Sequence, residues 1–224
     1  TNMSHMFNDC SNLLKVGEYI TRADLSNLDT RNVTNMSHLF ANCSKLEDIN
    51  FGDWSNKIFS TKNVKDTSHM FEGCSNLKKI DIKRFETINV TNMSYMFEDC
   101  TNLENLDISS FDTKKLKNMN HMFANCSKLK NIQFNNMINK INTENVEDMS
   151  GLFSNCLNLI DIDISSFNTK NVKNMSNMFA NCFKLENIQF ENKDRKINTE
   201  NVEDNFDMRN VINMDSMFCN CNNL

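Results

Sequence analysis

The stretch from Cys100 to Cys126, CTNLENLDISSFDTKKLKNMNHMFANC, decides the fold because variants of it recur along the whole chain. Each copy ends in a cysteine that has a phenylalanine three residues before it. The basic unit is the spacing of 26 residues from Cys100 to Cys126, and several units are lengthened by insertions. These repeat cysteines are Cys10, Cys43, Cys74, Cys100, Cys126, Cys156, Cys182 and Cys221.

Two hydrophobic periodicities lie within one unit. The alternation around Leu106 and Ile108 predicts a short strand with one apolar face. The apolar stripe from Leu116 through Met119 to Cys126 has steps of three and four residues and predicts a short helix.

The ends of this helix also have sequence signals. An Asn, Asp or Gly precedes every repeat cysteine, and these types tolerate the left-handed backbone that ends a helix. The helix start is expected to be capped by the asparagine before the first methionine of the unit, such as Asn92, or by the one three residues earlier, such as Asn89. Both alternatives remain open.

A single strand and a short helix cannot bury their apolar sides, whereas stacked copies share one core. The predicted fold class is therefore α/β, a right-handed leucine-rich-repeat-like parallel solenoid that forms one domain over residues 1–224, with coil boundaries near the repeat cysteines. Because helices need more room than strands, we expect the coils to fan apart and the strands to line a concave face. The incomplete first and last units indicate an excerpt of a longer array.

Composition excludes several classes of function. The 224 residues carry a net charge of −5 and no basic cluster, which argues against nucleic acid as a partner. No apolar run approaches the roughly 18 residues that a membrane-spanning helix needs. No membrane span is therefore expected in this segment.

The repeat resembles a known family. Residues 84–103, RFETINVTNMSYMFEDCTNL, and 166–185, SFNTKNVKNMSNMFANCFKL, resemble the BspA-like leucine-rich repeat surface proteins of bacteria. The resemblance implies a horseshoe of leucine-rich repeats in a cell-surface protein or lipoprotein, anchored by segments outside this chain, and some members of the family adhere to host matrix proteins.

Residue types that often carry chemistry have simpler explanations here. The repeat cysteines lack the paired C-x-x-C spacing of a zinc site, and separate helices should keep them too far apart for disulfides, so we interpret them as buried free thiols. Cys219 lies outside this pattern and is expected to be exposed. All four histidines occupy one repeat position that elsewhere holds Gly or Ser, which argues against catalysis. No enzyme activity, cofactor or metal is expected.

The outward side of the strands is the candidate binding surface. Three insertions, 52–58, 135–140 and 191–205, fall between a strand and the next phenylalanine position and add to one rim. The candidate protein-binding residues are Asp48, Asn50, Lys79, Asp81, Lys83, Asn105, Asp107, Ser109, Asn131, Gln133, Asp161, Asp163, Asn187 and Gln189 on the strands, with Trp54 and Arg195 on the rim.

Two functions are consistent with this surface. The first is a non-enzymatic adhesion or interaction scaffold at the cell surface, with a host or neighbouring-cell protein as partner. The alternative is a structural spacer that holds another module of a longer surface protein away from the cell. An ordinary solvated sheet face would suit the spacer.

Two registers compete in the last unit, one from Val202 and one from Val211. Only the second is followed by a complete apolar stripe, which ends at Cys221. Burial of each large side chain contributes roughly 1.5 to 3 kcal/mol, so we expect the Val211 register. The segment 191–205 should then be a long, protease-sensitive loop on the rim.

Overall fold

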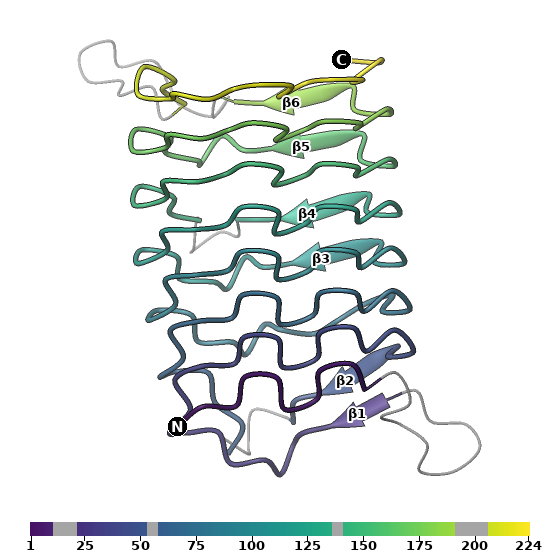
Figure 1. The fold of residues 1–224 in the computed structure, drawn as a ribbon, viewed down its shortest axis with the longest axis vertical. Helices are drawn as coiled ribbons and strands as arrows, with labels where there is room; N and C mark the ends of the chain where they lie inside the picture. Colours follow the sequence, from purple (N-terminus) through teal and green to yellow (C-terminus); the bar gives the residue numbers. More distant parts are fainter. Residues whose placement is uncertain (11–21, 53–57, 136–140, 191–205) are drawn as a thin grey trace.

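The chain folds into a stack of coils, as the repeat predicts. The computed structural model describes residues 1–10, 22–52, 58–135, 141–190 and 206–224. The coils are stacked along the longest axis, with short strands on one side of most coils and a series of turns crossing the other side (Figure 1). We call these the strand side and the turn side.

The strand side holds six strands of three residues each. They are β1 (Arg22–Asp24), β2 (Asp48–Asn50), β3 (Asn105–Asp107), β4 (Asn131–Gln133), β5 (Asp161–Asp163) and β6 (Asn187–Gln189). All pairing is parallel, in the pairs β1–β2, β3–β4 and β5–β6, and equivalent residues such as Leu106 and Ile132 lie opposite each other. The predicted parallel strands are confirmed. Their handedness of connection stays a prediction.

The turn side forms a continuous parallel ladder, which we call the turn ladder. Each coil contributes one bridge residue that pairs with the next coil. The series runs Asn2, Asn35, Asp66, Asn92, Asn118, Asp148, Asn174 and Asn213. From Met119 to Asn125, every second residue donates its N–H to a carbonyl of the next coil, at 2.8 to 3.3 Å. Met122, and every second residue from there to Cys126, donates instead to the carbonyl three residues earlier, at 3.1 to 3.3 Å.

The expected short helix is absent from the described residues, and turns stand in its place. His121 has φ 53° and Asn125 has φ 61°, and residues in the left-handed region interrupt a right-handed helix. Left-handed residues therefore recur every four residues on the turn side. The backbone there steps in and out in right-angled turns, as Figure 1 shows. Over eight residues this backbone path turns the same side chains inward as a helix does. The apolar stripe therefore predicted a helix where the structure has turns.

The signals at the helix ends proved to be turn signals. The residue before every repeat cysteine is left-handed, as predicted. Asn92 accepts the N–H of Ser94 at 3.1 Å through its side-chain oxygen, which is an Asx turn and not a helix cap. Asn89 donates its amide to the carbonyl of Lys62 in the preceding coil at 2.9 Å, so it links coils.

The core is a set of side-chain columns between the two sides. Phenylalanines of successive coils stack from Phe7 to Phe218 with ring centroids 5.3 to 6.0 Å apart. The methionines Met93, Met119 and Met175 are buried beside them. In the last coil, Val211 donates its N–H to Met208 and packs on the core, which confirms the Val211 register. Val202 and the segment 191–205 lie outside the described residues.

The expected curvature of the stack depended on helices, which the described residues do not form. Backbone hydrogen bonds of the turn ladder join the described coils on the turn side, so the wider spacing that helices would impose there is missing. The coils lie nearly parallel in the view of Figure 1. The concave shape of the strand side stays a prediction. No helix able to cross a membrane is found among the described residues.

Candidate binding surface on the strand face

The strand face is formed by the outward side chains of β1 to β6 and of segment 79–83. The central residue of a strand, such as Ile49 or Ile162, is buried, and its two neighbours point outward. The structure therefore brings most of the expected surface residues onto one face. Those exposed are Lys79, Asp81, Lys83, Asn105, Asn131, Gln133, Asp161, Asp163 and Asn187, and those partly exposed are Asp48, Asn50, Asp107 and Gln189.

One expected surface residue is misplaced. Ser109 is buried, with 7% of its surface exposed, because its hydroxyl donates to Asp107 at 2.6 Å and its N–H donates to the same carboxylate at 3.0 Å. It supports the surface and does not belong to it. Trp54 and Arg195 lie outside the described residues.

The last outward residue of several strands forms a turn that was not predicted from the sequence. Its side-chain oxygen accepts the N–H two residues later, which turns the chain away from the strand. The pairs are Asp24 with Ser26, Asn50 with Gly52, Asp81 with Lys83, Asp107 with Ser109 and Asp163 with Ser165, at 2.9 to 3.2 Å. Asp24 thus belongs to the face, and the Asp-x-Ser spacing was the signal that would have found it.

Neighbouring coils are tied together across the face. Asn131 donates its amide to Asn105 at 2.8 Å, and the Lys83 ammonium lies 3.3 Å from the Asp107 carboxylate. Burial alone would favour the neutral form of Asp107, but the bonds from Ser109 and Lys83 outweigh it and lower the pKa of Asp107. This part of the face is electrically balanced.

Three surface hollows lie on the strand face. The first, of about 320 Å³, lies between β2 and segment 79–84, and the second, of about 390 Å³, lies over β3 and β4. The third, of about 720 Å³, is lined only by residues of β5 and β6 and by Phe190.

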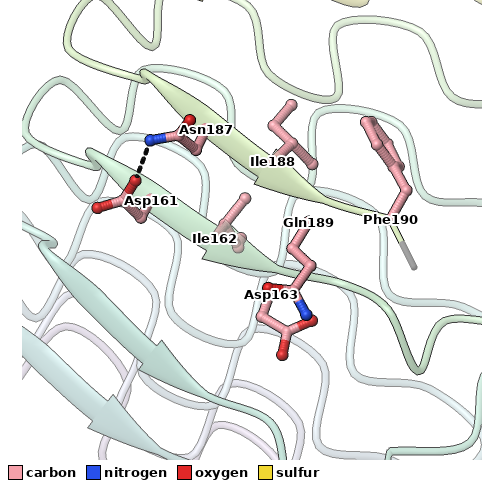
Figure 2. Close-up of a pocket in the computed structure, with 7 residues that line it drawn as sticks. All are labelled: Asp161, Ile162, Asp163, Asn187, Ile188, Gln189 and Phe190. Carbon is pink, nitrogen blue, oxygen red and sulfur yellow. Dashed lines mark hydrogen bonds between the residues drawn. The ribbon is translucent and has the colours of Figure 1, made fainter. Parts of the chain in front are cut away.

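The hollow over β5 and β6 has a distinct chemistry. Asp161 and Asp163 point outward from β5, whereas Ile188, the central residue of β6, and Phe190 are half-buried and pack against the core (Figure 2). Asn187 donates its amide to Asp161 at 2.7 Å. Among the residues that the structure describes, no lysine or arginine lines this hollow. Its outward side combines two carboxylates with amide groups, which suits a cationic side chain.

The cysteines form a buried column, as predicted. All nine are free, Cys219 is exposed, and the repeat cysteines from Cys43 to Cys182 are buried. The expectation that separate helices hold the cysteines too far apart for disulfides was wrong, because the turn ladder holds successive coils at hydrogen-bonding distance. Each buried thiol instead donates to a phenylalanine carbonyl of the preceding coil, as Cys126 does to Phe97 at 3.1 Å. Burial raises the pKa of Cys43 to about 12, which keeps this sulfur protonated and unreactive.

The fold and the surface define a repeat solenoid of the leucine-rich type. A family model described as the BspA-type leucine-rich repeat region matches residues 4–83, which confirms the resemblance seen in the sequence. A second model, described as Mycoplasma protein of unknown function, DUF285, matches residues 50–133, 129–204 and 187–224. The matches of this second model cover more than half of the chain, so the chain belongs to the DUF285 family.

Solved structures are similar to the chain over most of its length. A leucine-rich repeat protein from Bacteroides ovatus is 24% identical with a TM-score of 0.48, over 75% of this chain and 41% of that one. A leucine-rich cell surface protein from Faecalibacterium prausnitzii is 16% identical with a TM-score of 0.42, over 80% and 46%. The leucine-rich repeat protein of T. pallidum is 15% identical with a TM-score of 0.36, over 85% and 62%.

The chain therefore spans less than two thirds of each of these proteins. No curated protein shows significant similarity to the chain.

Proposed function

We propose that the chain is a non-enzymatic interaction scaffold of a bacterial cell surface and that it binds a protein partner, such as a host matrix protein, through the strand face. The observation that carries this proposal is that three hollows follow one another along that face. Solenoids present extended faces of this kind to protein partners. Among the candidate strand residues, five aspartates stand against two lysines, which favours a partner with a basic surface.

The hollow over β5 and β6 is the best candidate for the centre of the contact. A lysine or arginine side chain placed there brings its charge to Asp161 and Asp163. The balanced pair Lys83 and Asp107 lies further along the face and contributes orientation more than affinity.

The test measures binding of the 224-residue chain to immobilised fibronectin, laminin and collagen by surface plasmon resonance. The double variant Asp161→Asn, Asp163→Asn removes two charges and retains the turn at residue 163, because Asn50 forms the same turn in β2. We expect saturable binding to at least one of these proteins, and the double variant should weaken it at least about tenfold, the cost of roughly 1.4 kcal/mol.

The matched control is the double variant Glu144→Gln, Glu147→Gln, which removes two exposed charges from the turn side. It should bind like the unmodified chain. Equal losses in both double variants would show that net charge and not the strand face governs binding, and would contradict the proposal.

The spacer function is the second candidate. It is favoured by the strand-end carboxylates, several of which are already engaged in turns of the chain itself. A spacer predicts no saturable binding to any matrix protein by this chain, and adhesion of the longer protein that depends on a module outside it.

A further inference from the structure

A column of stacked rings runs along the turn ladder, remote from the strand face. It occupies the first left-handed position of successive coils and contains His5, His38, His69, Tyr95 and His121. The ring centroids of neighbours are 4.2 to 4.9 Å apart, with planes within 12° of parallel. The in-register ladder causes this stacking, since it places equivalent side chains of adjacent coils directly above one another.

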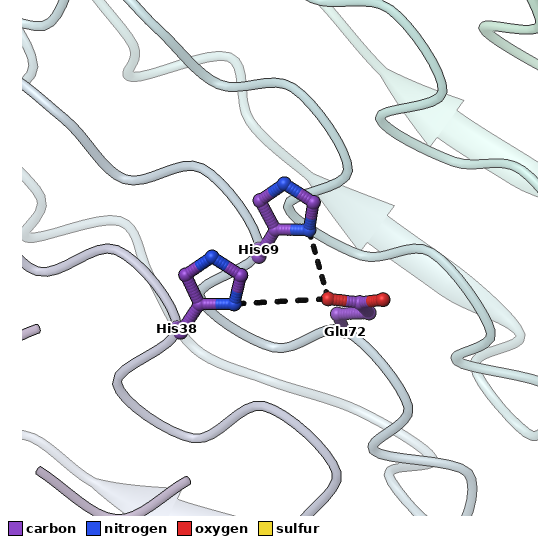
Figure 3. A group of neighbouring side chains, drawn as sticks. All are labelled: His38, His69 and Glu72. Carbon is purple, nitrogen blue, oxygen red and sulfur yellow. Dashed lines mark hydrogen bonds and ion pairs between the residues drawn. The ribbon is translucent and has the colours of Figure 1, made fainter. Parts of the chain in front are cut away.

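Three donor atoms converge at one level of this ring column. Nδ1 of His69 lies 2.8 Å from Oε2 of Glu72, and Nδ1 of His38 lies 3.9 Å from the same oxygen. Figure 3 shows both imidazoles directed at that oxygen from two successive coils. Ligand atoms of the three side chains all lie within 4.8 Å of one another.

The surroundings of these three side chains favour a cation. Each side chain is between 26% and 29% exposed, so the cluster is shielded from water but open to an ion. Glu98 has the same place in its coil as Glu72 has in the preceding one. The N–H of Gly73 donates to the Glu98 carbonyl in the same way as the N–H of Asn42 donates to the Glu72 carbonyl. Among the described residues, no lysine or arginine pairs with either glutamate.

We propose that His38, His69 and Glu72 bind a divalent transition-metal ion of the Zn²⁺ type. Two imidazole nitrogens and one carboxylate oxygen are donors that zinc, nickel and copper accept, whereas calcium and magnesium prefer oxygen alone. The second carboxylate, that of Glu98, adds negative charge near the bound ion. The fourth coordination position is left to water.

Binding requires a small movement of the two rings. Zinc–nitrogen bonds of about 2.0 to 2.1 Å in a tetrahedral site place two nitrogens roughly 3.3 Å apart. The rings must therefore tilt toward each other, and the Nδ1 of His69 must exchange its hydrogen bond to Glu72 for the metal. Because His38 belongs to one coil and His69 with Glu72 to the next, the ion joins two coils.

The test is a titration of the full chain with Zn²⁺ by calorimetry and with Co²⁺ by visible absorption. All proteins carry Cys219→Ser, which removes the exposed thiol. The variants are His69→Asn and Glu72→Ala, and both should fold because Asn177 and Ala124 occupy the equivalent positions of other coils. We expect one metal ion per chain, a metal-dependent rise in melting temperature, and at least about tenfold weaker binding in each variant.

The matched control is His121→Asn. His121 belongs to the same ring column, but Ala124 stands where Glu72 stands in its own coil. This variant should bind Zn²⁺ like the parent. The proposal is overturned if His69→Asn or Glu72→Ala binds as tightly as the parent, if His121→Asn loses as much affinity as His69→Asn, or if the parent shows no saturable binding up to on the order of 1 mM metal.

Discussion

The two sides of each coil differ in how strictly the repeat is kept. On the turn side an unbroken series of bridges joins eight coils from Asn2 to Asn213. On the strand side the strands form three separate pairs, and the segment 79–81 has no assigned strand. In the sequence, the insertions 52–58, 135–140 and 191–205 come directly after strand positions, before the next phenylalanine position.

The difference has a physical cause. The turn ladder needs a left-handed residue every fourth position, an inward side chain at fixed spacing and a carbonyl opposite each N–H, so an added residue would displace all three together. The strand face needs only a buried central residue, and its outward positions accept Asp, Asn or Lys. The turn side therefore maintains the stack, while the outward positions of the strand side are free to vary.

The largest effect is expected from a charge in the buried column of the turn side. Phe123 is 0% exposed and stacks between Phe97 and Phe153 at centroid distances of 6.0 and 5.6 Å. Phe123→Asp should destabilise the chain by more than about 4 kcal/mol or prevent folding, because an unpaired charge replaces a large apolar side chain. Circular dichroism with urea unfolding measures this. A cooperative transition with an unchanged midpoint would disprove the packing of this column.

The second effect tests the left-handed positions of the turn ladder. Asn125 has φ 61°, and a β-branched residue there is strained by about 1 to 3 kcal/mol. Asn125→Val should therefore lower the urea midpoint well below that of Asn125→Gly, which loses the same side-chain hydrogen bond to Asn155 without the strain. Equal midpoints for the two variants would contradict the left-handed assignment.

The third effect is a pH dependence located on the turn side. Burial, followed by the charges of Asp99 and Glu72, raises the pKa of Glu98 from 4.5 to about 7. Between these values the folded chain keeps a proton that the unfolded chain has lost, so the free energy of unfolding falls as the pH rises from about 4.5 to about 7. Glu98→Gln removes this loss and should stabilise the chain at pH 8 by on the order of 1 kcal/mol after solvent screening, with little effect at pH 4.

The histidines provide an internal contrast for that measurement. Burial, followed by the neighbouring His69 and His5, lowers the pKa of His38, and burial lowers the pKa of His121. Their neutral forms stabilise the folded chain above pH 6.5, and this stability is lost as the pH falls below that value through the lowered pKa values. The acid-side loss should persist in Glu98→Gln. Melting temperatures that depend on pH in the same way in both proteins would contradict the assignment to Glu98.

The smallest effect is expected on the strand side. Asn131→Ala removes an exposed hydrogen bond to Asn105 and should change the free energy of unfolding by no more than about 0.5 kcal/mol. Urea midpoints compared with those of Asn125→Gly rank the two sides directly. A larger loss for Asn131→Ala would show that the strand face and not the turn ladder holds the coils together.

The sequence by itself determined the repeat, the parallel stacking, the inward columns of Phe, Met and Cys and the left-handed residue before each repeat cysteine. These features depend on local spacing and on the need to bury apolar side chains, both of which are written in one unit. It also placed most of the strand-face residues correctly, because alternation assigns each residue to one face of a strand.

Only the tertiary structure decided between a helix and the turn ladder. The apolar positions at Met119, Met122, Phe123 and Cys126 are shared by both, and the choice depends on N–H groups that find their carbonyls in the next coil. The same contacts between coils stack the imidazoles and bring His38 to His69 and Glu72, although His38 belongs to the preceding unit of the sequence. The sequence of a single unit does not show that these three side chains come together, because their approach depends on the register between neighbouring coils.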